Sequence, residues 1–375
     1  MTEPPRVLLL SERRLETPKW QAAHYEFEDV IAEIDSVRLV APARAPLGLV
    51  TDLRRRVTRR VGRPELVGEP LAEAVDVDGF YDLFFCIMHF PTDLAHLHRL
   101  RGWRERCNKA VCFLVELWEH EIPRSTPYLE LLKRFGFDHV FILHARHRDV
   151  VRRLSGAPCD YMGVGVDALR FSPYPSPPPR VVDFYQFGRR SPYTHQAALR
   201  LARTEGAFYL YDTVFNVPLP DPRAHREAIA SIVKRARYFF AYTAADDHER
   251  AAGEDVVSAR YIEGIAGGAI VLGSAPRVPE FTELFPWADA TIAIPYEAHD
   301  LKEIVSELER SPERLAAARI NNVVGTLRRH DWVYRWQQVL DAVGLPATPA
   351  MAARKARLAE LADVAGTPSM LERVS

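Results

Sequence analysis

The chain has 375 residues, of which 47% are hydrophobic and 26% charged, and its formal net charge at pH 7 is -1. This length accommodates two domains with separate cores, and the composition is that of an ordinary globular protein. A charge so close to zero argues against binding nucleic acid or an anionic membrane through bulk electrostatics. The arginine-rich stretch 54–63 is a local exception, which we interpret as an exposed face or as an acceptor-binding or interface segment.

The four cysteines do not show the spacing of a zinc site, and two of them lie in apolar runs. Reduced thiols in a cytoplasm fit this pattern best. No apolar run approaches the roughly 20 residues needed to span a bilayer. The apolar run near the N-terminus is too short for a signal peptide and reads as a first strand. We therefore expect a cytoplasmic protein.

The first half of the chain alternates short apolar runs with segments of helical periodicity. The runs that predict strands are 6–10, 37–40, 81–88, 110–117 and 140–143. Helices are predicted over 19–34, from 91 onward, over 127–135 and over 146–154. Strands that alternate with helices of this length favour a parallel, doubly wound sheet. We assign residues 1–170 to a Rossmann-like first domain.

A proline-rich segment, 171–180, reads as a linker because it can continue neither a strand nor a helix. The alternation then restarts, with strands predicted at 182–187, 208–211, 238–242, 269–272 and 291–294. Residues 181–328 therefore form a second Rossmann-like domain. Residues 329–375 carry a final helix near 330–340 and a short tail helix with frayed ends, and we expect these helices to return to the first domain.

The segment 253–280 contains several candidate binding residues close together in sequence. Its periodicity predicts a helix that begins near Asp255 and is ended by a Gly-Gly pair, followed by a buried strand. Glu254 and Asp255 stand at the mouth of this helix, and Glu263 lies two turns further in. The free N–H groups of a helix N-terminus suit a phosphate, and flanking carboxylates can accept from sugar hydroxyls. This combination indicates a nucleotide-sugar site.

This segment resembles the E-x7-E region of retaining glycosyltransferases of the GT-B fold, of the family-4 type. It is especially similar to the spore-coat-type branch, whose S-x-R-x-x-E pattern is matched by Ser258, Arg260 and Glu263. A second match is the hinge segment around 163–173, which is similar to N-G-V-D-x-x-x-F-x-P. The resemblance covers about residues 80 to 343. It implies two Rossmann-like domains facing across a cleft, with a C-terminal helix that crosses back to the first.

The resemblance also implies roles for residues at the donor site. The first acid of the family pattern, here Asp255 or Glu254, contacts the donor sugar, and the second, Glu263, contacts the ribose. A Gly-Arg pair after the first strand of the second domain contacts the diphosphate; here the residues are Gly188, Arg189 and Arg190. The lysine usual a few residues later is absent, so Arg189, Arg190 or Arg260 is expected to supply its charge.

On the first domain, His89 follows a buried strand, and the resemblance places such a histidine near the donor sugar. The alternative is a histidine whose ring nitrogens form hydrogen bonds only with the backbone or with solvent. We list His89 and Asp255 as catalytic candidates and Glu119 and His120 as acceptor-side candidates; His144 reads first as a polar residue at a helix start. We expect a transferase that moves a sugar from a nucleoside diphosphate sugar to a small molecule, a natural product or a cell-surface glycan. We expect it to need no metal and no further cofactor. A nucleotide-sugar epimerase and a non-catalytic binding subunit remain as alternatives.

Overall fold

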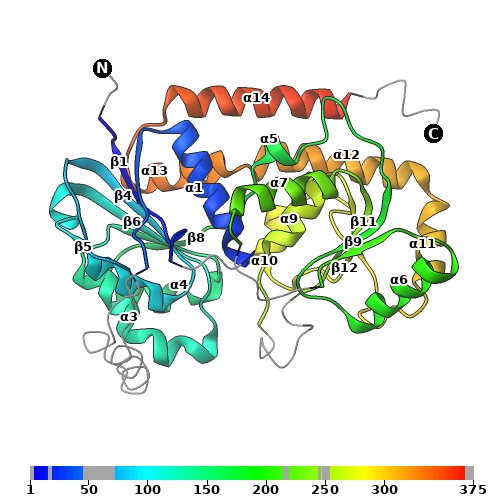
Figure 1. Ribbon diagram of the computed structural model, residues 1–375, viewed down its shortest axis with the longest axis horizontal. Helices are drawn as coiled ribbons and strands as arrows, with labels where there is room; N and C mark the ends of the chain where they lie inside the picture. Colours follow the sequence, from blue (N-terminus) through cyan, green and yellow to red (C-terminus); the bar gives the residue numbers. More distant parts are fainter. Residues whose placement is uncertain are drawn as a thin grey trace. The chain divides into compact units, whose positions relative to one another are not determined.

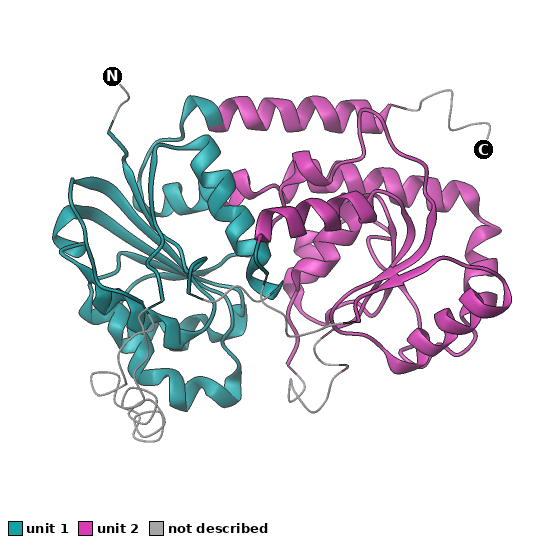
Figure 2. Cartoon of the chain, in the orientation of Figure 1, with its two compact units in different colours: residues 1–163, 218–220, 336–350 teal, residues 164–217, 221–335, 351–375 magenta. Residues whose placement is uncertain are grey.

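The computed structural model describes residues 4–15, 19–44, 72–213, 219–243, 246 and 254–367. The arginine-rich stretch 54–63 lies outside these residues. The chain forms two compact units, shown in different colours in Figure 2. Unit 1 comprises residues 1–163, 218–220 and 336–350, and unit 2 comprises residues 164–217, 221–335 and 351–375.

Unit 1 is built on a six-stranded parallel sheet in the order β2-β1-β4-β6-β7-β8. Its strands are Val37–Val40, Val7–Leu10, Tyr81–Met88, Cys107–Leu114, His139–Ile142 and Cys159–Tyr161. Most of their side chains are buried, as expected for strands covered on both faces. The predicted parallel sheet of the first half is confirmed.

Helices and short 3-10 turns connect the strands of unit 1 (Figure 1). They are η1 Lys19–Gln21, α1 Ala22–Ile34, η2 Pro91–Arg99, η3 Arg104–Arg106, η4 Glu119–Glu121, α3 Ile122–Arg134, η5 Ala145–His147 and α4 Arg148–Ser155. A two-stranded parallel pair, β3 Val75–Asp76 and β5 Leu100–Arg101, lies apart from the main sheet. The segment predicted as a helix from Pro91 is a 3-10 helix.

Unit 2 is built on a five-stranded parallel sheet in the order β10-β9-β11-β12-β13. Its strands are Tyr209–Tyr211, Val182–Gln186, Ala236–Ala241, Ile270–Gly273 and Ile292–Ala293. Its helices are α5 Ala168–Phe171, α6 Pro192–Thr204, α7 Pro222–Val233, α9 Ala259–Ala266, α10 Pro279–Leu284, α11 Leu301–Glu309 and α12 Pro312–Arg329. The second Rossmann-like alternation is therefore also present.

The helix predicted to begin near Asp255 begins at Ala259 instead. Ser258 is its N-cap, with extended backbone angles, and residues 254–258 precede the helix as a loop. Val256 and Val257 fall by chance on the helical period of the residues that follow. Asp255 is therefore three residues before the N-cap, not at the mouth of the helix.

Helix α13, Trp332–Val343, belongs to both units: its first turn is part of unit 2, and from Trp336 onward it is part of unit 1. In unit 1 the Trp336 indole N–H donates to Asp35 Oδ2 over 2.8 Å, and Arg6 binds the other oxygen of that carboxylate over 2.7 Å. The tail helix α14, Pro349–Gly366, is longer than the short helix that we expected. Its residues from 351 onward belong to unit 2, whereas our bounds placed all of 329–375 with the first domain.

A buried ion cluster ties α14 to the rest of unit 2. Arg354 Nε donates to Asp331 Oδ1 over 2.8 Å, and its Nη2 donates to Asp167 Oδ1 over 2.6 Å. All three residues are buried. Asp331 also accepts from the backbone N–H of Ala168 over 2.9 Å, so the cluster joins three segments that are far apart in sequence. Among the described residues, no helix is both long and apolar enough to cross a membrane.

Candidate functional site

The strand order of unit 2 determines where a ligand would be expected. In this sheet β10 lies on one side of β9 and β11 lies on the other side, so the order of the strands reverses at β9. In open parallel sheets, ligands bind beyond the carboxyl ends of the strands at such a reversal. Gly188 follows β9 and Thr243 follows β11 at this point. The predicted donor segment 188–190 therefore lies at the expected edge of the sheet.

Gly188 has a backbone conformation that favours glycine. Its φ of +72° is in the left-handed region, and an added Cβ would lie 2.9 Å from Arg260 Nη1. Its N–H donates to the carboxylate of Asp212, 3.2 Å from Oδ2. The same carboxylate binds Arg190, whose Nη2 also donates to the main-chain oxygen of Asp212 over 2.6 Å. Arg190, one of our phosphate candidates, is therefore engaged within the protein.

Arg189 and Arg260 form a pair of cations next to Gly188. Within the described part of the chain, neither guanidinium makes a hydrogen bond or an ion pair with another residue. Burial, followed by the charge of Arg189, lowers the pKa of Arg260 to about 10. Two like charges that are partly buried together favour an anion between them. Of the three arginines that we considered, these two are the ones available to a phosphate.

The N-terminus of α9 adds backbone donors to the same place. Arg260 is in the first turn of this helix, which follows the N-cap Ser258. The hydroxyl of Ser258 makes no cap bond, and its Oγ is buried without a hydrogen-bond partner among the described residues. A helix N-terminus carries unsatisfied N–H groups and a partial positive charge. Two arginines, an unpaired hydroxyl and a helix N-terminus together suit a diphosphate.

Glu263 lies on the inner face of α9, where it is almost fully buried. Its Oε1 forms an ion pair with Arg226 of α7, which is buried as well. The Arg226 guanidinium also lies over the ring of Phe171, 4.9 Å from its centroid. The carboxylate predicted to contact ribose thus has a protein partner, and Arg226 is a residue that our sequence reasoning missed.

The two candidates for the donor sugar have different surroundings. Asp255 Oδ2 accepts from the backbone N–H of Arg277 over 2.9 Å, and Oδ1 accepts from Val256 N–H over 3.1 Å. Asp255 therefore ties its own loop to the loop that follows β12. Glu254 is buried. A contact of either residue with the donor sugar remains a prediction.

In unit 1, His89 follows β4 at the reversal between β1 and β4. Its side chain is 5% exposed, and its Nδ1 has no hydrogen-bond partner among the described residues. Its ring lies 5.3 Å from that of His24 and 4.5 Å from that of Phe90. Burial lowers the pKa of His89 to about 4, which Glu116 opposes only in part. His89 is therefore a neutral imidazole at pH 7.

This pKa predicts how stability depends on pH. The unfolded chain takes up a proton at His89 near pH 6.5, whereas the folded chain does so only near pH 4. The contribution of His89 to the free energy of unfolding is therefore fully present above pH 6.5 and is lost as the pH falls toward 4. His89→Asn should remove about 2.4 kcal/mol of the fall in unfolding free energy between pH 7 and pH 4.5, measured in urea. The exposed His120→Asn should leave that fall unchanged, and an equal fall in wild type and His89→Asn would contradict the assignment.

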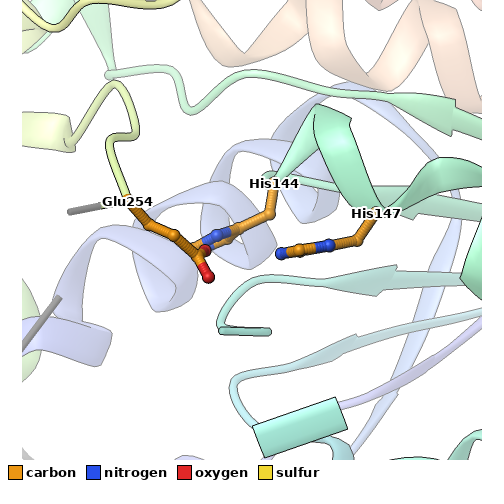
Figure 3. A group of neighbouring side chains, drawn as sticks. All are labelled: His144, His147 and Glu254. Carbon is orange, nitrogen blue, oxygen red and sulfur yellow. The ribbon is translucent and has the colours of Figure 1, made fainter. Parts of the chain in front are cut away.

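The strands next to β4 end in further polar groups. Glu116 follows β6, and its N–H donates to the His89 oxygen over 2.8 Å. His144 follows β7, and its Nε2 lies 3.8 Å from Glu116 Oε2. Figure 3 shows His144 with His147, whose ring stacks on it with centroids 6.1 Å apart. The third residue labelled there, Glu254, belongs to unit 2.

The predicted acceptor-side residues lie in the short helix η4. Glu119 is exposed and pairs with Arg146 over 3.1 Å, with about half or more of each side chain in solvent. His120 is exposed as well. An acceptor role for Glu119 and His120 remains a prediction.

Sequence reasoning missed Asp212, Arg226 and Glu116 as site residues. A sequence signal existed for Glu116, which is a charge near the end of an otherwise apolar run. We had extended that strand to residue 117, but it ends at Leu114. Asp212 directly follows β10, so the rule that ligands bind at strand carboxyl ends could have indicated it. Arg226 gave no signal, because its partner is distant in sequence.

Part of the chain matches a known protein family. Residues 201–341 match the model of a family described as glycosyl transferase-like. This region contains β10 to β13 and α9, and it includes Arg260 and Glu263. No curated protein sequence matches the chain.

Solved structures resemble most of the chain. An alpha-glucosyltransferase in complex with UDP and a 13-mer DNA containing an HMU base superposes with a TM-score of 0.53 at 9% identity, covering 91% of this chain and 100% of that one. HepE of Anabaena, in complex with UDP and glucose, gives 0.48 at 12% identity, over 91% and 99%. AviGT4, involved in avilamycin A biosynthesis, gives 0.44 at 12% identity, over 91% and 97%. The first likeness, with the two parallel sheets, shows the GT-B fold that we predicted.

Proposed function

We propose that this chain, a glycosyltransferase by its GT-B fold and by the family match over residues 201–341, transfers a sugar from a UDP-sugar to an acceptor hydroxyl. The observation that carries the proposal is the pair Arg189 and Arg260 at the N-terminus of α9, beside Gly188. UDP is proposed because the structurally similar alpha-glucosyltransferase was solved with it. The donor diphosphate would bind to these two guanidiniums and to the N–H groups of α9.

The chemistry assigned to unit 2 is stabilisation of the leaving group. As the bond to the sugar breaks, negative charge develops on the diphosphate. Fixed guanidiniums and helix N–H dipoles stabilise that charge without reorganising. Because Arg189 and Arg260 supply two positive charges, we propose that the reaction needs no metal ion. Retention of the anomeric configuration is proposed on the resemblance of the segment around Ser258, Arg260 and Glu263 alone.

A thermal-shift panel of UDP, GDP, dTDP, ADP and CDP tests the donor site. A ligand at about 100 times its dissociation constant stabilises a protein by roughly 2.7 kcal/mol. We expect UDP to give the largest shift, and the shift to be the same with magnesium and with a chelator. A panel without any shift would contradict the donor site, and a shift that requires magnesium would contradict metal independence.

Activity separates the transferase from its two alternatives. With UDP-glucose and a mixture of acceptors, a transferase releases UDP faster than with UDP-glucose alone and forms a glycoside. The anomeric proton of that product, observed by NMR, reports retention or inversion. Conversion of the donor sugar without acceptor would favour an epimerase. UDP binding without any turnover would favour a binding subunit.

A further inference from the structure

Three neighbouring strands of unit 1 end in polar side chains that form one row. His89 follows β4, Glu116 follows β6 and His144 follows β7. The strands pair in parallel up to their last residues, so their carboxyl ends are level. The backbone bond from Glu116 to His89 and the 3.8 Å approach of His144 to Glu116 hold the row together. We call these three residues the strand-end row.

Glu116 is the fixed anion of this row. Burial alone would raise its pKa, but His144, His89 and Trp118 outweigh burial, so the pKa is lowered. The carboxylate is therefore ionised at neutral pH. An ionised carboxylate only accepts hydrogen bonds, and its two oxygens offer about four lone-pair sites. A ligand hydroxyl that donates to Glu116 would form a charge-assisted bond.

His89 provides a second polar atom without a partner. It is more than nine-tenths buried, and no described residue hydrogen-bonds its Nδ1. A buried polar atom that has no partner is unfavourable, and such atoms commonly mark a place where a ligand binds. Glu116 and His89 therefore provide hydrogen-bonding side chains at the ends of two adjacent strands.

Aromatic rings surround the strand-end row. Trp20 is 51% exposed, and its ring lies 6.5 Å from that of His89. Phe90 is 38% exposed, with its ring 4.5 Å from His89. Trp118 packs edge-on against His144 at 4.6 Å. A pyranose has apolar C–H faces and a rim of hydroxyls, so it fits exposed rings beside polar groups.

We infer that the strand-end row binds the hydroxyls of a carbohydrate acceptor, with Glu116 accepting a hydrogen bond from one of them. This inference rests on the proposed function, because it assigns the acceptor of that reaction. A sugar is favoured over a phenol by the polar row, and the fixed anion disfavours an acceptor phosphate or carboxylate at this point.

Saturation-transfer NMR on the full chain tests the inference with four probes: the methyl α-glycosides of glucose, galactose and mannose, and 4-methylumbelliferone. We expect at least one methyl glycoside to receive saturation from wild type and to bind about 10- to 150-fold more weakly to Glu116→Gln. The matched control is Glu130→Gln, which changes an exposed carboxylate on α3. It should bind as wild type does. Far-UV circular dichroism establishes that each variant is folded.

The results of this glycoside-binding experiment can be distinguished from those of the test of the donor site. Saturation of 4-methylumbelliferone alone, saturation of no glycoside, or equal affinity of wild type and Glu116→Gln would each overturn the inference. The UDP thermal shift, recorded on the same samples, reports the donor site of unit 2 independently. A retained UDP shift with no glycoside binding contradicts only the acceptor inference, and Glu116-dependent glycoside binding without a UDP shift contradicts only the proposed donor.

Discussion

Replacing Arg260 with methionine should weaken UDP binding by about 10- to 150-fold without lowering the stability of the folded chain. The loss follows from removing a charge-assisted bond to phosphate, which contributes roughly 1.5–3 kcal/mol. Stability should be unchanged or higher, because burial and Arg189 lower the pKa of Arg260 and the fold therefore disfavours its charge. Isothermal titration with UDP and urea unfolding measure the two effects.

Two further variants make the test of Arg260 specific. Arg203→Met changes an exposed arginine of α6 in the same unit and should leave UDP affinity unchanged. Arg260→Lys keeps the charge but loses the planar fork, so its affinity should lie between those of wild type and Arg260→Met. Unchanged affinity in Arg260→Met would remove this residue from the donor site, and a marked loss of stability would show that it has a structural partner.

Glu263→Gln should lower the unfolding free energy by about 3–5 kcal/mol, because it leaves the buried Arg226 without a counter-charge. From sequence we would have expected this variant to weaken nucleotide binding in an intact fold. The ion pair changes that expectation, because Glu263 and Arg226 connect α9 to α7 inside unit 2. Urea unfolding of wild type and variant at pH 7 measures the loss.

A double-mutant cycle distinguishes the ion pair from a simple packing effect. Arg226→Met combined with Glu263→Leu removes both charges, and such apolar replacements are often neutral or stabilising. The double variant should therefore be more stable than either single variant. Additive losses would show that the two side chains do not act as a pair. UDP titration of the stable double variant then tests the ribose role separately, since a ribose contact by Glu263 would still be lost.

The continuous apolar runs made the sheets predictable. Residues 81–88 were assigned as a strand with the bounds that the structure shows, because a short and nearly continuous apolar run is typical of a strand buried on both faces. Residues 37–40 were also assigned with the observed bounds, although this strand is not fully buried and contains the exposed Arg38. The start of α9 was misplaced, because Val256 and Val257 matched the helical period although they lie in the loop before the helix. Ser258, a favoured N-cap residue, was the signal for the true start.

The candidate site was predictable only where local sequence determines it. Gly188 could be assigned from its place after a strand, since a tight turn there needs glycine. The sequence could not distinguish Arg189 from Arg190, because the difference depends on Asp212, which another strand positions. The partner of Glu263 was equally hidden, because Arg226 precedes it by 37 residues on a different helix. Pairings between distant segments exist only once the chain has folded.

The buried contacts of the last helices bear on how the chain folds while it is being synthesised. Asp35 emerges from the ribosome early, but its partner Trp336 follows some 300 residues later. The ion pairs of Asp167 and Asp331 with Arg354 likewise form only after Arg354 has been made. Domains usually fold in the order in which they emerge. Here unit 1 includes residues 336–350 and unit 2 includes residues from 351 onward, so neither unit can complete its core until these segments have been made.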